Sequence, residues 1–107
     1  MPDMKEPLPI FDALHIPPTA LEQGGVEVLR AAVLGQELHF SLMRGFADPA
    51  AWGLVFVDAA RHVARVYAHE KLFSEDEAVE RIRAAFEQAI REPPEGSAEV
   101  TAIAKPE

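Results

Sequence analysis

The most regular pattern of apolar and polar residues in this 107-residue chain runs from residue 48 to residue 70. Apolar residues recur there at intervals of three and four, the spacing that places side chains along one face of an α-helix. Asp48 is a favoured N-cap residue, and Pro49 suits the first helical position because an N–H there would have no partner. The pattern predicts an amphipathic helix over 49–70, about 33 Å long. Its predicted core face consists of Trp52, Val55, Phe56, Ala59, Val63, Val66 and Tyr67.

Between residues 26 and 43 the apolar residues recur at every second position, which is typical of strands. Gly35 and Gln36 interrupt this alternation, so the segment predicts a β-hairpin. The second strand has a clear apolar face of Leu38, Phe40 and Leu42. On the first strand both faces carry apolar residues, and the more consistent inward set is Leu29, Ala31 and Val33.

A second amphipathic helix is expected from Ser74 to the residues before Pro93. Ser74 and Glu77 match a capping box, in which the serine accepts from the amide three residues on and the glutamate bonds back to the serine amide. Because proline disfavours a helical predecessor, the helix should end before Pro93 and Pro94. Its apolar face is formed by Val79, Ile82, Phe86, Ala89 and Ile90.

The two ends of the chain differ from this central part. Residues 1–18 hold five of the nine prolines and predict an extended arm, whose apolar residues we expect to lie on the body of the domain. Residues 19–23 predict one helical turn, which Gly24 and Gly25 can end. Residues 93–107 form a C-terminal linker and tail, with weak strand character over 99–104. A single α+β domain over 19–92 is expected between arm and tail.

The expected fold is α+β, an antiparallel hairpin-based sheet with two helices packed on one face in the order ββαα. A hairpin alone is marginal in water, so a third strand is expected. The arm, residues 98–104 or another copy of the chain could supply it, and the sequence does not choose among them.

Composition excludes several classes of function. The net charge of −8, from 18 acidic and 10 basic residues, argues against a nucleic-acid partner, which requires a basic surface. The chain has no cysteine, so disulfides and thiolate metal sites are excluded. Neither a signal peptide nor an apolar run long enough for a membrane span is present, so we expect a cytoplasmic protein with no membrane partner.

Residues 20–92 resemble a small bacterial family of domains of unknown function. The resemblance is most specific at the helix start, Asp48-Pro49 followed by Trp52-Gly53, and at Arg61-His62-Val63-Ala64-Arg65. That family carries no assigned activity, ligand or catalytic residue. The resemblance therefore supports the domain limits and transfers no function.

The densest group of ionisable residues on the long helix is a polar stripe opposite its core face, where Asp58 accompanies the candidate ligand-binding residues Arg61, His62, Arg65 and His69. Such a stripe could bind an anion or a small molecule. It could equally be an exposed face with ordinary ion pairing. Because the arginines would repel a cation, no metal site is expected. No catalytic residue and no cofactor are predicted either.

A stripe of small residues lies beside the core face of the same helix and includes Gly53, Ala60, Ala64 and Ala68. Small residues allow another helix to approach closely. The partner could be the second helix of the same chain, or a second copy in a homodimer.

These observations favour a small, soluble, non-enzymatic interaction or regulatory module, a homodimer open to a further protein partner. The alternative is a small-molecule or anion-binding domain, possibly enzymatic, that uses the Arg/His stripe.

Overall fold

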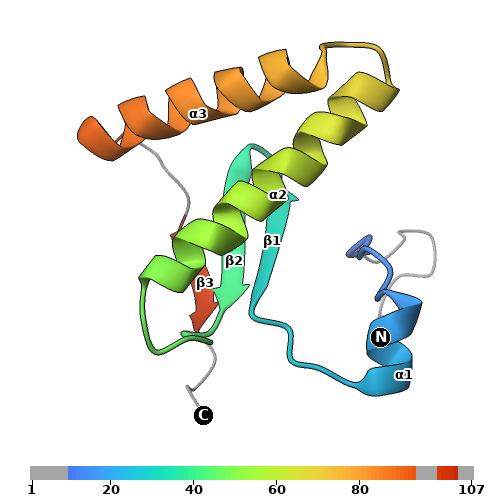
Figure 1. Ribbon diagram of the computed structural model, residues 1–107. Helices are drawn as coiled ribbons and strands as arrows, with labels where there is room; N and C mark the ends of the chain where they lie inside the picture. The colour runs from blue at the N-terminus through green and yellow to red at the C-terminus, as the bar shows by residue number, and fades with distance from the viewer. Residues whose placement is uncertain (1–9, 94–98, 104–107) are drawn as a thin grey trace, which may run out of the picture.

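The computed structural model describes residues 10–93 and 99–103. It contains α1 (Pro18–Gln23), β1 (Leu29–Leu34), β2 (Glu37–Leu42), α2 (Ala50–His69), α3 (Glu75–Arg91) and β3 (Glu99–Ile103). In Figure 1, α2 crosses the β1–β2 hairpin, α3 turns back from the end of α2, and α1 lies apart from both helices. The predicted α+β class and the order ββαα are confirmed.

The hairpin turns through a two-residue loop at Gly35 and Gln36. Gly35 has a φ of 64°, a left-handed conformation that glycine adopts without strain. Glycine at the first central position is the signature of a type II′ turn, whose twist matches that of the strands. The antiparallel register pairs Ala31 with Phe40 and Val33 with Leu38. Paired residues share a face, so the apolar sets predicted on the two strands lie on the same side of the sheet.

The third strand comes from the C-terminal segment. β3 pairs in parallel with β2, and the strand order is β1-β2-β3. Of the three sources that the sequence left open, residues 99–103 therefore supply the strand. β2 is the central strand, and β1 and β3 form the two edges.

The start of α2 is tied to the exit of the hairpin. The Asp48 carboxylate accepts a hydrogen bond from the Ala50 N–H at 2.9 Å, and the helix begins at Ala50, one residue after the predicted start. The indole N–H of Trp52 donates to the Arg44 carbonyl at 2.7 Å, and its ring lies edge-on to Phe46 with centroids 5.6 Å apart. These contacts fix the direction in which α2 leaves the sheet.

α3 begins as predicted at a serine cap. Ser74 Oγ accepts from the Glu77 N–H at 3.1 Å, and three acidic residues occupy the first turn, where the helix dipole favours them. The reciprocal half of the capping box does not form. Instead the Glu77 carboxylate lies 3.4 Å from the Arg81 guanidinium, because a partner four residues on is within reach on the helix surface.

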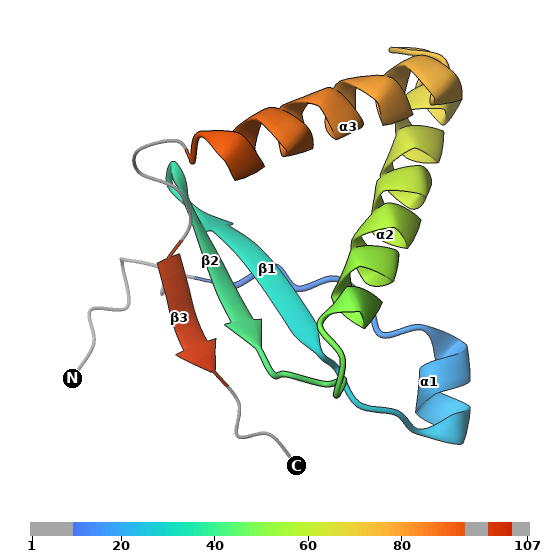
Figure 2. The same cartoon turned by 60° about the vertical axis from the view of Figure 1, so that its left-hand side comes forward.

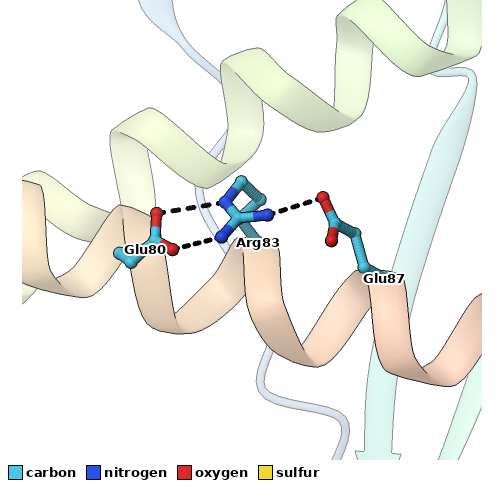
Figure 3. A network of polar contacts seen from close by, with 3 residues as sticks. All are labelled: Glu80, Arg83 and Glu87. Carbon is cyan, nitrogen blue, oxygen red and sulfur yellow. Dashed lines mark hydrogen bonds and ion pairs between the residues drawn. The ribbon is translucent and has the colours of Figure 1, made fainter.

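An ion-pair network runs along the exposed face of α3 (Figure 3). Arg83 donates to both oxygens of Glu80, and another of its nitrogens lies 2.6 Å from Glu87. The hydrogen bonds that Arg83 donates to Glu80 and Glu87 raise the pKa of Arg83 above its ordinary value. The Arg83 hydrogen bond lowers the pKa of Glu80. The network keeps two of the many acidic charges locally paired.

α2 and α3 pack against each other where small side chains meet. Within residues 10–93, only Ala64 of α2, with no exposed area, and Ala78 of α3 are buried. Around this contact Arg65 pairs with Glu75 at 3.7 Å, and the rings of Tyr67 and Phe73 lie 5.9 Å apart. Alanine permits close helix contact, so the small stripe of α2 packs against α3.

The large residues of the predicted core face of α2 are not enclosed. Phe56 is 43% exposed and Val66 is 53% exposed. Within the described ranges no Cα of α2 or α3 lies within 8 Å of a strand Cα. The radius of gyration is 17.1 Å, against about 13 Å for a compact domain of this length. The expectation that this face forms a closed core is therefore wrong for the single chain, because the helices pack on each other and stand off the sheet.

Candidate functional site

The predicted Arg/His stripe lies on the surface of α2. Arg61, His62, Arg65 and His69 are all exposed. Arg65 faces Glu75 of α3, a partner that sequence reasoning did not identify. In the described part of the chain, no salt bridge involves the other three side chains. The stripe thus presents one paired and one unpaired guanidinium, and its role in ligand binding stays a prediction.

Metal-ligating side chains do not gather on this stripe or elsewhere in residues 10–93 and 99–103. No group of three or more His, Cys, Asp or Glu side chains has the arrangement to hold an ion there. Arg61 and Arg65 flank His62 on the helix, and their charges oppose a cation. Whether zinc binds to the chain is therefore a question for titration.

The small stripe divides into two parts. Ala64 is buried and Ala60 and Ala68 are half-buried, on the helix that contacts α3. Gly53 is exposed, and a Cβ added to it would meet nothing within 4 Å. No neighbouring atom of residues 10–93 or 99–103 therefore requires glycine at this position. The prediction that the stripe contacts a second copy stays open, with Gly53 as its most accessible member.

A larger apolar surface lies on the faces that periodicity predicts as core. α3 leaves Phe86 and Ile90 exposed, the latter at 65%, and the hairpin leaves Leu38 exposed near its turn. On α2 the exposed members of the predicted face are Phe56, Ala59, Val63, Val66 and Tyr67. Exposed apolar surface on several elements is a feature of proteins that interact with a partner.

A groove separates the N-terminal arm from β1, and Figure 2 shows α1 set off from the edge of the sheet where β1 lies. The groove has a volume of about 1270 Å³, and 19 residues line it, from the arm, α1 and β1. The Arg30 guanidinium lies 5.7 Å from the centre of the Phe11 ring. Glu27 holds the same guanidinium through two hydrogen bonds, at 3.0 and 3.2 Å.

Sequence reasoning missed this groove. Its signals were present as two separate observations, an arm too apolar for a free tail and a hairpin with an unpaired edge. The sequence did not indicate that the arm would stand beside that edge and leave a space between them.

A protein-family model matches residues 13–94. The chain belongs to the family described as Domain of unknown function (DUF5076). The DUF5076 match includes the 20–92 segment on which the resemblance rested, so that prediction is confirmed. None of the curated proteins compared with the chain matches it.

A solved structure is similar to this DUF5076 domain over most of both chains. It is described as "a putative pyruvate dehydrogenase from the photosynthetic bacterium Rhodopseudomonas palustrus CGA009". The two chains are 42% identical, the match covers 86% of this chain and 96% of the other, and the TM-score is 0.70. Within the described residues of the DUF5076 chain, no helix has both the length and the apolar character needed to cross a bilayer.

Proposed function

We propose that this DUF5076 domain is a non-enzymatic interaction module that acts as a homodimer. One observation carries the proposal, namely that the large apolar residues of the predicted core faces of α2 and α3 are exposed. Burial of apolar area stabilises a protein by about 25 cal/mol per Å². A chain that leaves such faces in water gains this free energy when a partner covers them.

A second copy of the chain is the simplest partner for these apolar faces, because no other protein has to be assumed. Closed twofold pairs are the commonest soluble oligomers, and the same patch then covers itself. The charge of −8 on each copy does not prevent this pairing, because charges separated by more than about 8 Å are largely screened at physiological ionic strength. The acidic residues also cluster on the exposed face of α3, where Arg83 pairs two of them.

Sedimentation equilibrium at micromolar concentrations tests the proposal. We expect a species of twice 11.7 kDa. Val66→Glu places a charge on the exposed apolar face of α2 and should shift the equilibrium toward monomer. Ala85→Glu, at an exposed alanine of α3, is the matched control and should leave the mass unchanged. A wild-type chain that sediments only near 11.7 kDa would overturn the proposal.

The similar solved structure favours a second candidate, binding of a small carboxylate. Its description names pyruvate dehydrogenase, and pyruvate carries a carboxylate that a guanidinium can hold. The exposed Arg61 side chain, which forms no salt bridge among the described residues, is the part of the Arg/His stripe free to do so. Calorimetric titration with pyruvate tests this, with Arg61→Gln as the comparison. Heat that is equal for both proteins would remove this candidate.

A further inference from the structure

The free edge of β1 can be assigned residue by residue. The Met43 N–H donates to the Val28 carbonyl at 3.1 Å, so Val28 and Met43 form a hydrogen-bonded antiparallel pair. Such pairs alternate along a ladder. The register then gives Arg30, Ala32 and Leu34 as the residues bonded to β2. The N–H and C=O groups of Leu29, Ala31 and Val33 therefore point away from β2, and all three residues line the groove.

This edge has the properties of a pairing surface. β1 is a six-residue strand with one charged residue and no proline, and Val33 is 73% exposed. Natural proteins usually protect such an edge with charges, proline or a covering segment. The arm does not pair with it, since no backbone hydrogen bond joins β1 to the arm in the described part of the chain.

The groove is too large and too open to be read as a pocket for a small molecule, since such pockets have about 300–1,000 Å³ and enclose their ligand. It is lined by β1 and by apolar residues of the arm, among them Ile10, Leu14 and Ile16. Its 19 lining residues approach the roughly 20–30 that each partner contributes to a standard protein interface.

We infer that the groove receives the β1 strand of a second copy, which pairs antiparallel with β1 about a twofold axis through Ala31. This inference rests on the proposed homodimer and names its interface. In the register that pairs all three outward residues, Leu29 lies opposite Val33 of the partner copy and Ala31 opposite itself. The two sheets then form one six-stranded sheet.

The same axis accounts for the exposed arm and the exposed helices. An axis perpendicular to the sheet leaves both α2–α3 pairs on one face, where the exposed residues of α2 meet those of the second copy. Each arm reaches past its own β1 to the sheet of the partner copy. Leu14, which is 91% exposed in the single chain, becomes a contact residue there.

Ala31→Cys tests the register, because the chain contains no other cysteine. Cα atoms of a hydrogen-bonded antiparallel pair lie about 5.5 Å apart, within the range of about 4.4–6.8 Å for a disulfide. We expect mild oxidation to link the Ala31→Cys variant into dimers at least about tenfold faster than the control Ala85→Cys, as measured on non-reducing gels. If Ala31→Cys links slowly although the chain sediments as a dimer, the β1 interface is overturned and the homodimer stands. A wild-type monomer would overturn both.

Val33→Pro provides a test that needs no cysteine. Proline removes the outward N–H of residue 33 and leaves the bonds between β1 and β2 intact. Val33→Thr keeps the N–H and is the matched control. Two hydrogen bonds are lost per dimer, so the dissociation constant should rise about tenfold or more for proline and stay near wild type for threonine. Equal constants for the two variants, with circular dichroism like the wild type, would overturn the inference.

Discussion

The α2–α3 unit and the β1 side of the molecule use the same residue types in opposite ways. α2 and α3 meet through Ala64 and Ala78, the only buried side chains within residues 10–93, and an ion pair and a ring contact lie beside this contact. On the β1 side, apolar residues of the arm and of the strand remain exposed across a groove. The small residues of α2 and α3 have a packing partner within the chain, and the outer edge of β1 has none among the described residues.

The difference follows from what each region needs. Two consecutive helices joined by a short connection can pack as soon as small residues face each other. A strand edge needs another extended segment with free backbone groups, and β1 and β3 already occupy the two edges of β2. Local signals thus account for the contact between α2 and α3, whereas the outer edge of β1 has no backbone partner within the described residues.

The largest effect is expected at Trp52, which joins the two regions. Its indole donates to Arg44, and its ring contacts Phe46 and Phe56, each with centroids 5.6 Å apart. Trp52→Ala should lower the free energy of unfolding by about 3 kcal/mol. Denaturant melts measure this, and Trp52→Phe, which keeps an aromatic ring, should lose less. A loss below about 1 kcal/mol would mean that Trp52 does not anchor α2.

A smaller effect is expected at the α2–α3 contact. Ala64→Leu inserts a larger side chain where no area is exposed and should cost about 1–3 kcal/mol by overpacking. Ala85→Leu on the exposed part of α3 is the matched control and should stay within about 0.5 kcal/mol of the wild type. Equal stabilities for the two variants would show that the helices do not pack as closely as the structure has them.

The N-cap of α3 should contribute less to the free energy of unfolding than the α2–α3 contact does. Ser74→Ala removes the oxygen that accepts from the Glu77 N–H and should cost about 1 kcal/mol. Ser74→Asp keeps an acceptor at the same position and should retain most of the stability. If thermal melts place the alanine and aspartate variants together, the cap does not stabilise the helix.

The smallest effect should come from Glu80. Its hydrogen bond with Arg83 lowers its pKa below the ordinary 4.5, so the bond stabilises the folded state above that pH and is lost as the pH falls through the lowered pKa. The stability difference between the wild type and Glu80→Gln should therefore shrink between pH 6 and pH 3. Because both side chains are exposed, the difference should be small at every pH. A difference that grows on acidification would contradict the assigned sign.

The elements themselves could be predicted because their signals are local. Asp48, Ser74 and Gly35 mark a helix start, a second helix start and a hairpin turn, and each lies at the position that the sequence indicated. The apolar face of the hairpin was also predictable, because paired residues on neighbouring strands share a face and apolar residues alternate along each strand.

The packing partners of the helices and strands could not be predicted. Periodicity marked the large residues of α2 as core, but it does not distinguish a face covered by the same chain from one covered by another copy. The pairing of Arg65 with Glu75 and the parallel pairing of β3 with β2 depend on how distant segments meet. Ligand binding by the Arg/His stripe remains a prediction. A ligand site requires side chains that converge from different elements, whereas the stripe lies along one helix.

Amide hydrogen exchange along β1, followed by NMR, tests the central claim most directly. In a lone chain the amides of Arg30, Ala32 and Leu34 are bonded to β2, while those of Leu29, Ala31 and Val33 point to water and should exchange rapidly. The account predicts that all six are protected at concentrations where the chain dimerises. Protection of the outward three should fall on dilution, while the inward three stay protected. Rapid exchange of the outward three at every concentration would show that β1 is a free edge and would contradict the account.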